Sequence, residues 1–427
     1  MIGRFAMSNQ NNKILLLTWE ISPMYAGGLG ILTESVVKEM QNQGLDITVL
    51  VPQVPKSIKL PDYVISLEKQ TKKYYKQKLN IPDFDFDLEN FRKSNRPEKI
   101  GWPKIFSNPN KQKSSSYNLY SNNTPAITRA FAFAVQDFIK IESGYRAIIG
   151  MDWMSIASFR LLKYNKVSTP FIFYVNSTEY DRSLDELKLG SSSKDLWNTE
   201  HENYQIAENI ISVSDITKKI LVKEFNVDSK KIITVYNDIT FYPSNDHYKT
   251  IKQNKTVLFI GRIANQKGLF FLLDTAKRVL EIDNQVKFII AGDGEILPEV
   301  VEAVASKGLE KNCIFTGWLD TDQKKKLYRS SDLFVMPSPS EPFGLTPLEA
   351  IRSDLPVISS EKCGFIGVVP STPTFKYYDT NAFTQLILYY LGSKENRIEL
   401  LLKQQADLQK HSWSKEVAKI VKLIDTL

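Results

Sequence analysis

The stretch KILLLTWEISPMYAGGLGILTESVVKEMQNQGLDITVLV, residues 13–51, decides the fold. It begins with a short apolar run at 13–18, of the length expected for a buried strand. A glycine-rich turn at 27–30 follows, and then a helical stretch with apolar residues on one face, which ends near Gly44. The run at 47–51 predicts the next strand. Strand, glycine loop, helix and strand form a βαβ unit, which predicts a parallel sheet with right-handed crossovers.

The alternation of strands and helices continues from this unit to about residue 240. Residues 55–125 interrupt it, because they are rich in lysine, asparagine and serine, and we interpret them as a long surface excursion. We therefore predict an N-terminal Rossmann-like domain at 1–240. Its later strands are expected at 147–149, 171–175, 209–213 and 232–235, and its later helices at 126–141, 153–163 and 216–224.

A second domain of the same kind is predicted at 241–410. The polar, aperiodic residues 238–252 are typical of an interdomain linker, and the apolar run 256–260 restarts the alternation. Two doubly wound α/β domains place a cleft at the carboxyl ends of both sheets, where such folds bind ligands. The further strands of this domain are expected at 286–290, 314–316, 333–336 and 357–359.

The bulk composition is that of a soluble protein of two domains. The 427 residues exceed one ordinary core, and 42% hydrophobic and 24% charged residues are globular values. Two cysteines and three histidines give neither a disulfide framework nor zinc-ligand spacing. The opening lacks the apolar core of a signal peptide, and no apolar run approaches the roughly 18 residues of a membrane span. We therefore predict a cytoplasmic protein without an integral membrane segment.

The net charge of +7 is small for this length and scattered along the chain. The lysine run 324–326 predicts a solvated helix face rather than a polyanion site. No basic stripe is interleaved with aromatic residues, which argues against a nucleic-acid partner. A dinucleotide oxidoreductase is excluded, because Gly27-Gly28-Leu29-Gly30 is not Gly-x-Gly-x-x-Gly and no acidic residue ends the second strand.

Two loops of the second domain could carry chemistry, and the first follows the strand 256–260. It reads Gly261-Arg262-Ile-Ala-Asn-Gln-Lys267-Gly268 and leads into a helix. Two cations and a helix N-terminus at the ligand end of a sheet could jointly neutralise a diphosphate. The alternative is a solvated basic loop.

The second loop follows the strand 333–336 and reads Ser340-Glu341-Pro-Phe-Gly344-Leu345-Thr346-Pro347-Leu-Glu349-Ala. Glu341 has no capping role, and Gly344 would let the backbone approach a ligand. A carboxylate there could accept hydroxyl groups of a sugar, while the amides of Leu345 and Thr346 face phosphate oxygens. For Glu349 the alternative is structural, because Thr346, Pro347 and Glu349 also fit a capping box with proline at the first helical position.

Together these loops resemble the donor site of retaining GT-B glycosyltransferases of family four, and the whole chain resembles the glycogen and starch synthase-like branch. The fold implied is GT-B, with two Rossmann-like domains facing each other across a cleft. The resemblance covers almost the whole chain, and its further motifs are Trp19-Glu20, Gly27-Gly28-Leu29-Gly30, Met151-Asp152-Trp153, Ser177-Thr178-Glu179-Tyr180-Asp181-Arg182, Val213-Ser214, Val235-Tyr236-Asn237 and His411-Ser412-Trp413.

The resemblance implies a set of roles at the donor side. Arg262 and Lys267, beside Gly261, would hold the donor diphosphate and stabilise the leaving group. Glu341 would contact the hexose, and Glu349 the nucleotide ribose. The backbone amides of Leu345 and Thr346 would bind phosphate beside Gly344, and Gly28 would let the first domain close on the same diphosphate.

The resemblance also implies how the reaction proceeds. The acceptor hydroxyl would attack from the face that the nucleotide leaves, the leaving phosphate would take its proton, and the backbone carbonyl of Asn176 would lie next to the anomeric carbon. Asp152 and Glu179 would serve on the acceptor or sugar side. No metal and no cofactor are expected, since the nucleotide sugar, UDP- or ADP-glucose, is a substrate. The segment 411–427 would cross back onto the first domain.

The sequence departs from the branch at several positions. Met151 and Asn176 stand where the branch has histidines, and Tyr236-Asn237-Asp238 stands where it has His-Asn-Gly. Gly367 stands where an acidic residue is expected. The diphosphate-binding set is intact, so we favour an active enzyme with shifted specificity over a degenerate, sugar-nucleotide-binding regulatory protein.

The predicted function is transfer of a hexose, in the first place glucose, to a glucan-type acceptor. The alternative enzyme of the same fold adds one hexose to a lipid, a protein glycan or a small sugar. An exposed amphipathic basic helix in the first domain would favour a membrane acceptor, and the sequence shows no clear one. We expect the nucleotide base to be recognised near Trp318 and Leu319. The identity of the base, the acceptor and the oligomeric state stay open at this point.

Overall fold

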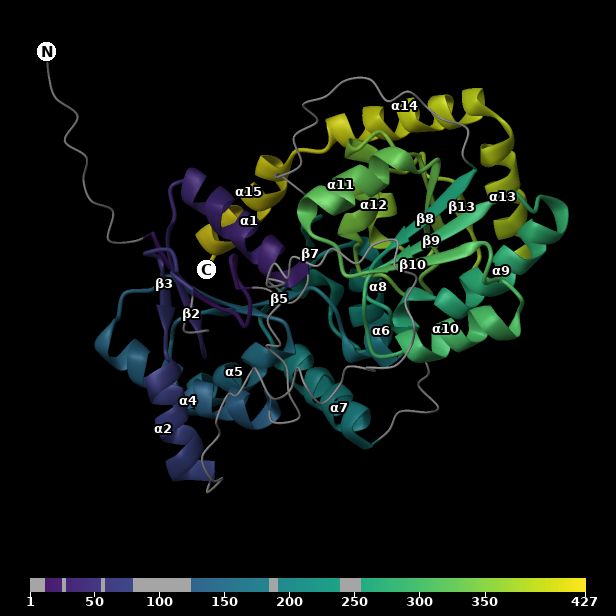
Figure 1. Cartoon of the computed structure of the whole chain (residues 1–427). Helices are drawn as coiled ribbons and strands as arrows, with labels where there is room; N and C mark the ends of the chain where they lie inside the picture. The colour runs from purple at the N-terminus through teal and green to yellow at the C-terminus, as the bar shows by residue number, and fades with distance from the viewer. Residues whose placement is uncertain (1–11, 25–27, 55–57, 80–123, 184–190, 239–254) are drawn as a thin grey trace, which may run out of the picture.

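A computed structural model describes residues 12–24, 28–54, 58–79, 124–183, 191–238 and 255–427. The chain forms two parallel sheets, each covered by helices, so the predicted fold class of two Rossmann-like α/β domains is confirmed (Figure 1). Each strand is short and apolar, as expected where helices bury both faces of a sheet.

The first sheet has the strand order β3-β2-β1-β4-β5-β6-β7, and every pairing is parallel. Leu16 of β1 lies between Val49 of β2 and Ile149 of β4, which sets the register at the point where the strand order reverses. The strands are β1 (Lys13–Leu17), β2 (Asp46–Val51), β3 (Val64–Ser66), β4 (Ala147–Met151), β5 (Phe171–Val175), β6 (Asn209–Ser212) and β7 (Ile232–Thr234).

The helices of this part of the chain connect successive strands. A 3-10 turn at Trp153–Ser155 leads into α5, and Ser214 caps α8 by accepting the amide of Thr217. The helices are α1 (Gly28–Asn42), α2 (Glu68–Leu79), α4 (Thr124–Ile141), α5 (Ile156–Tyr164), α6 (Glu179–Ser183), α7 (Ser191–Ile206) and α8 (Asp215–Lys223).

The second sheet has the order β10-β9-β8-β11-β12-β13 and is also parallel. Its order reverses at β8 and β11, so the loops after these two strands share one edge, where ligands of such folds bind. The strands are β8 (Thr256–Ile260), β9 (Lys287–Ala291), β10 (Cys313–Gly317), β11 (Leu333–Met336), β12 (Val357–Ser360) and β13 (Thr374–Phe375).

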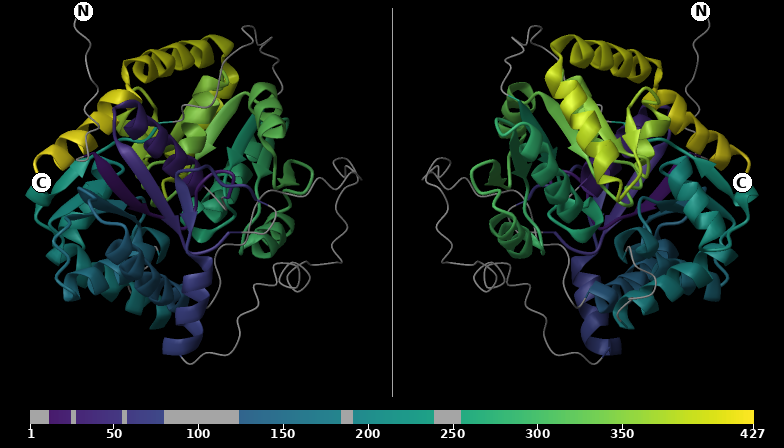
Figure 2. Two further views of the ribbon diagram at one scale, coloured as in Figure 1. Left: turned by 90° about the vertical axis from the view of Figure 1, so that its left-hand side faces the viewer. Right: turned by 90° about the vertical axis from the view of Figure 1, so that its right-hand side faces the viewer.

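The last helix crosses back to the first sheet. The indole Nε1 of Trp413 donates to the carbonyl oxygen of Ser35 in α1 at 3.3 Å, and Arg146 pairs with Asp425 at 3.0 Å. Figure 2 shows α15 against α1 from two further directions. The helices are α9 (Leu269–Ile282), α10 (Leu297–Ser306), α11 (Thr321–Ser330), α12 (Leu345–Arg352), α13 (Thr380–Gly392), α14 (Lys394–Lys410) and α15 (Trp413–Asp425).

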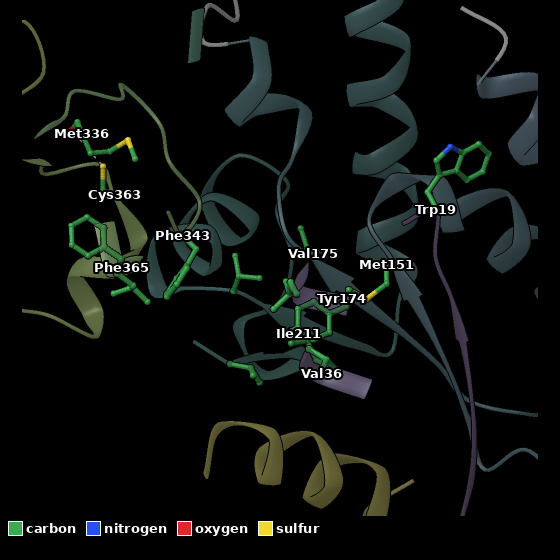
Figure 3. Packing of buried hydrophobic residues seen from close by; sticks show 14 of the residues in the cluster. Trp19, Val36, Met151, Tyr174, Val175, Ile211, Met336, Phe343, Cys363 and Phe365 are labelled. Atoms are coloured by element: carbon green, nitrogen blue, oxygen red, sulfur yellow. Dashed lines mark hydrogen bonds between the residues drawn. The ribbon is translucent and has the colours of Figure 1, made fainter. Parts of the chain in front are cut away.

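The buried apolar residues of both sheets belong to one contiguous cluster. Figure 3 shows part of it, with Met151 and Tyr174 from the first sheet region and Phe343, Cys363 and Phe365 from the second. The two halves therefore pack directly on each other, which fixes the loops at the facing edges of the sheets.

The prediction that residues 55–125 form a long surface excursion without regular structure is wrong for the first part of this segment. Residues 64–66 form the edge strand β3, and 68–79 form α2, which packs on α4. Lysines fill the exposed side of α2, so the short apolar pattern of its buried side did not stand out. Residues 80–123, and the linker predicted at 238–252 apart from Asp238, lie outside the described residues.

Candidate functional site

The two loops singled out from the sequence meet at the edge where β8 and β11 end. The loop after β8 forms a 3-10 turn at Asn265–Lys267, and Gly268 follows with φ +69°. A Cβ atom at Gly268 would lie 2.2 Å from the carbonyl oxygen of Pro337, so only glycine allows this turn to pack on the loop after β11. The packing brings Lys267 to Glu341.

Lys267 Nζ and Glu341 Oε2 form an ion pair that is largely buried. The Glu341 backbone is fixed on both sides, because its amide donates to the carbonyl of Lys362 at 3.0 Å and its carbonyl accepts from the amide of Gly364 at 2.9 Å. Glu341 is therefore a rigidly placed carboxylate beside a cation.

Arg262 lies in the same loop and is exposed. Among the described residues its guanidinium has no hydrogen-bond or ion-pair partner, unlike Lys267. Arginine offers several N–H donors in a planar fork that matches phosphate oxygens. This loop thus presents an uncommitted cation at the edge of the sheet.

The N-terminus of α12 lies at the same edge. Gly344 precedes the helix with φ +94°, and no side chain caps the first turn. The amides of Leu345 and Thr346 occupy the first two positions of the helix, where N–H groups lack intrahelical acceptors. Such a terminus favours an anion.

The capping box considered for Glu349 is wrong. The helix begins at Leu345 rather than Pro347, and the Glu349 carboxylate accepts hydrogen bonds from Lys324 Nζ at 2.7 Å and Tyr328 Oη at 2.8 Å. The lysine run predicted a solvated helix face, and for Lys324 this prediction is wrong, because its ammonium group pairs with Glu349. The spacing of Lys324 and Tyr328, one helical turn apart on α11, was the available signal.

The first sheet region reaches the same edge through Gly28 at the start of α1. A Cβ atom at Gly28 would lie 3.4 Å from Leu345 Cδ1, so the N-termini of α1 and α12 face each other across the two halves. Gly27 lies outside the described residues.

Asp152 follows β4 with φ 53°, an unusual conformation for a residue other than glycine. Its Oδ1 accepts the backbone amides of Asn176 at 2.6 Å and Ser177 at 3.3 Å. Burial raises the pKa of Asp152 to about 6, against the opposing effects of the Asn176 amide and the charge of Arg182. Asp152 thereby fixes the backbone at the end of β5.

Asn176 itself stands directly after β5. Its carboxamide oxygen and nitrogen are both buried and make no hydrogen bond of normal geometry with the described residues, although the group lies near the Asp152 carboxylate. Buried polar atoms without partners are rare in folded proteins. The side chain is therefore a candidate for contact with a bound molecule.

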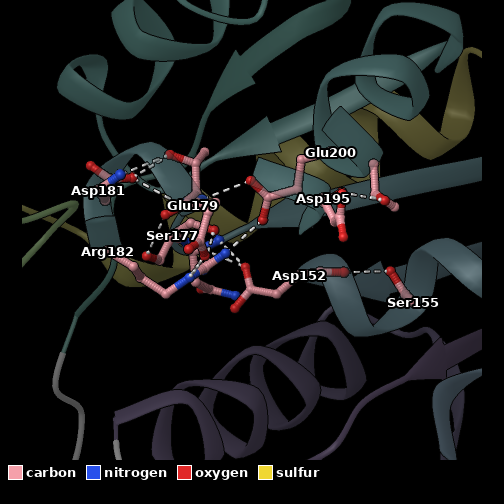
Figure 4. Close-up of polar contacts among 11 residues, drawn as sticks. Asp152, Ser155, Ser177, Glu179, Asp181, Arg182, Asp195 and Glu200 are labelled. Atoms are coloured by element: carbon pink, nitrogen blue, oxygen red, sulfur yellow. Dashed lines mark hydrogen bonds and ion pairs between the residues drawn. The ribbon is translucent and has the colours of Figure 1, made fainter. Parts of the chain in front are cut away.

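Glu179 belongs to a buried ionic network (Figure 4). Arg182 donates to Glu179 Oε2 at 2.9 Å and to Glu200 Oε1 at 2.7 Å, and Glu200 Oε2 accepts the amide of Glu179 at 2.7 Å. Burial raises the pKa of Glu200 to about 7, opposed by the charge of Arg182. Nothing in the local sequence of α7 pointed to Glu200.

Tyr236 and Gly367, two of the positions that depart from the family pattern, are in contact with each other. A Cβ atom at Gly367 would lie 2.3 Å from Tyr236 Oη, so the phenol fills the space that a side chain at 367 would need. The changes at Tyr236 and Gly367 are thus a single, mutually compatible arrangement.

Within the described ranges, no group of three or more histidine, cysteine, aspartate or glutamate side chains is placed to hold a metal ion. Among the same residues, no helix combines the length and apolar character that crossing a bilayer requires.

Comparison with known proteins identifies the class of this site. Residues 13–254 match the family described as the starch synthase catalytic domain, and residues 244–412 match the family described as glycosyl transferases group 1. The chain belongs to the starch synthase catalytic domain family, with a group 1 glycosyltransferase domain after it, and is a glycosyltransferase of the GT-B fold.

The relatives described here are distant, and each aligns with most of the chain. An uncharacterised glycosyltransferase of Methanocaldococcus jannaschii is 23% identical over 84% of this chain and 82% of its own. Among solved structures, the sucrose-phosphate synthase of Thermosynechococcus elongatus has a TM-score of 0.72 at 15% identity, over 97% of this chain and 98% of its own. The Anabaena protein HepE, in complex with UDP and glucose, has a TM-score of 0.64 at 14% identity, over 97% and 99%.

Proposed function

We propose that this protein is a retaining, metal-independent hexosyltransferase that moves a hexose, in the first place glucose, from a nucleotide sugar to a glucan-type acceptor. The observation that carries the proposal is the convergence of Arg262, Lys267 and the N-terminus of α12 at one sheet edge, with Gly28 of α1 opposite. Two side-chain cations and two helix termini supply the positive charge that a diphosphate needs.

The donor would lie along this edge. Arg262 and Lys267 bind the diphosphate, which displaces Lys267 from part of its contact with Glu341 and frees that carboxylate for hexose hydroxyls. Glu349, held by Lys324 and Tyr328, receives the ribose hydroxyls. The base would lie near Trp318, which is 43% exposed after β10.

The reaction breaks the bond between the anomeric carbon and the diphosphate oxygen and forms one to the acceptor oxygen. The acceptor proton passes to the leaving phosphate on the same face, so the configuration is retained. The backbone carbonyl of Asn176 stabilises the positive charge at the anomeric carbon. Asp152 holds that backbone through its hydrogen bond to the Asn176 amide, and Glu179 holds the following turn.

The experiment is a transfer assay with UDP-glucose and ADP-glucose, with and without glycogen. We expect glycogen-dependent transfer that falls by about 100- to 1000-fold in Arg262→Ala, since it removes charge stabilisation of the leaving group. Glu341→Gln should fall similarly. The matched control is Lys277→Ala, which removes an exposed cation from α9. Full transfer in Arg262→Ala would contradict the donor site.

Binding of nucleotide sugar without turnover on any acceptor would favour the degenerate, regulatory reading. The changes at Met151, Asn176 and Gly367 bear on the acceptor and sugar sides, so this outcome would place the loss there. The donor site would then serve as a sensor of nucleotide sugar.

A second acceptor class is favoured by α2. Its exposed lysines lie at spacings of three and four, on one face, while Thr71 and Tyr75 are buried. Its apolar side packs on α4, so α2 would contact an anionic surface through the charge of its lysines alone. Transfer to an acceptor lipid in anionic vesicles, lost when these lysines are replaced by glutamine, would support it over glycogen; the lysines are Lys69, Lys72, Lys73 and Lys76.

A further inference from the structure

Glu341 is flanked by two contacts between the halves of the molecule. The residue before it, Ser340, and the residue after it, Pro342, are each hydrogen-bonded to the first sheet region. Both partners there, Asp181 and Ser214, belong to the N-terminal turns of helices. The contacts are therefore built on parts of the backbone that capping already fixes.

Asp181 uses its two carboxylate oxygens for different purposes. Oδ2 accepts the amide and the hydroxyl of Thr178 at 2.9 and 2.8 Å, and Thr178 Oγ1 accepts the amide of Asp181 at 3.3 Å, which is a reciprocal cap at the start of α6. Oδ1 accepts the hydroxyl of Ser340 at 2.6 Å. The cap aims this second oxygen at the other half of the molecule.

Asp181 is fully buried in this arrangement. Burial raises the pKa of its carboxyl group, opposed by the hydrogen bonds from Ser340 and Thr178. If the halves separated, Oδ1 and the Ser340 hydroxyl would return to water, while the cap within α6 would persist. The hydrogen bond to Ser340 thus stabilises the closed arrangement specifically.

Ser214 makes the second contact in the same way. It caps α8 by accepting the amide of Thr217 at 3.1 Å, and its hydroxyl donates to the carbonyl oxygen of Pro342 at 2.6 Å. Gly364 lies against this point, because a Cβ atom there would lie 2.6 Å from Ser214 Oγ. The Pro342 carbonyl is therefore held in a close-packed interface.

We propose that Asp181 and Ser214 are positioning residues that add to the hold on the Glu341 loop when the two halves are closed, beyond the backbone hydrogen bonds that Glu341 makes within its own half. The proposal rests on the proposed function for the role of Glu341, but the coupling itself can be measured without turnover. Closure would then complete the placement of the hexose-binding carboxylate, which would limit loss of the donor to water in the open state.

The test removes one hydroxyl group. Ser340→Ala leaves the α6 cap intact and deprives Asp181 Oδ1 of its partner, and we expect transfer to fall by about 10- to 100-fold from the cost of an unpaired buried acceptor. UDP affinity should stay within about two-fold of wild type, because Arg262, Lys267 and α12 are unchanged. The control is Ser338→Ala, a buried serine of the same loop whose hydroxyl contacts Met336 Sδ within the second sheet region.

A second variant reverses the hydrogen bond instead of removing it. In Asp181→Asn the side-chain oxygen can accept from Thr178, while the amide nitrogen donates to Ser340 Oγ, since a serine hydroxyl both donates and accepts. We expect this variant to keep most of the activity that Asp181→Ala loses. A purely electrostatic role of the carboxylate would instead make both variants equally poor.

Hydrogen exchange provides the readout that does not depend on activity. Ser340→Ala should speed amide exchange both at 338–344 and at 178–183, on opposite halves, whereas Ser338→Ala should leave 178–183 unchanged. Unchanged exchange at 178–183 in Ser340→Ala, or the same change in Ser338→Ala, would overturn the proposal. If wild type binds no nucleotide sugar, the proposed function fails, while the exchange result still decides the coupling.

Discussion

The two sides of the candidate site differ in the sign of their surplus charge, which is positive at the second sheet and negative at the first. At the second sheet, Lys267 pairs with Glu341, Lys324 pairs with Glu349, and Arg262 is left exposed, so this edge has a surplus cation. The first sheet side, within the described residues, gathers buried carboxylates around the guanidinium of Arg182 (Figure 4). These carboxylates are Asp152, Glu179, Asp181 and Glu200.

This difference indicates where each part of a nucleotide sugar would lie. A diphosphate would be repelled by the acidic side and attracted to the edge that carries Arg262 and Lys267. Carboxylates and their backbone partners suit neutral hydroxyl groups instead. The asymmetry thus favours the diphosphate on the second sheet and the transferred sugar and acceptor toward the first.

The largest expected effect comes from breaking the balance on the donor side. Lys267→Ala removes a phosphate-binding cation and leaves the buried Glu341 carboxylate without its partner, so transfer should fall by about 100- to 1000-fold. Steady-state kinetics with UDP-glucose measure this, with Lys277→Ala as the control. A loss confined to KM, with kcat unchanged, would mean that Lys267 stabilises the bound ground state and the transition state equally.

On the acidic side, the expected effect is a pH dependence of stability. The pKa of Glu200 is raised from 4.5 to about 7, so the folded state binds more protons than the unfolded state between these values. The contribution of Glu200 to the free energy of unfolding should therefore fall as pH rises from about 4.5 to about 7, by about 3 kcal/mol at most.

Chemical denaturation of wild type and Glu200→Gln across this range tests it. The stability of wild type relative to the variant should decrease with rising pH through that window and then level off. A constant difference from pH 4.5 to 8 would show that Arg182 keeps Glu200 ionised throughout.

The smallest expected effect comes from Lys324. Lys324→Ala removes one of the two partners of Glu349 and leaves Tyr328 in place, so nucleotide affinity should fall by about 3- to 10-fold, the value of one ordinary hydrogen bond. Calorimetric titration with UDP measures it. Lys326→Ala, an exposed lysine of the same run, serves as the control and should bind as wild type does.

The sequence predicted much of the fold because each strand of a parallel sheet is a short apolar run, and the loops that follow such strands share one edge. That rule predicted from the sequence alone that Arg262, Lys267 and Glu341 lie at one edge of the second sheet. It also explains the failure at 64–79, where a two-turn contact surface of Leu67, Thr71 and Tyr75 was hidden among lysines.

The contacts between distant segments could not be read in the same way. Glu200 reaches Arg182 from another helix, and Ser340 reaches Asp181 across 159 positions of the chain. Hydrogen bonds of this kind depend on how completed domains face each other, for which local periodicity carries no signal. The prediction of a capping box at Thr346 was wrong for a related reason. The helix begins at Leu345, and Glu349 accepts hydrogen bonds from Lys324 and Tyr328, which lie on another helix.

The most direct test of the account is calorimetric titration of UDP and UDP-glucose into wild type, Arg262→Ala and the control Lys277→Ala. The account predicts that Lys277→Ala binds each ligand with the affinity of wild type. Arg262→Ala should lose about 10-fold or more in affinity for each ligand, as expected for a charge-assisted contact to phosphate. Equal affinity in Arg262→Ala and wild type would contradict a diphosphate site at the edge after β8.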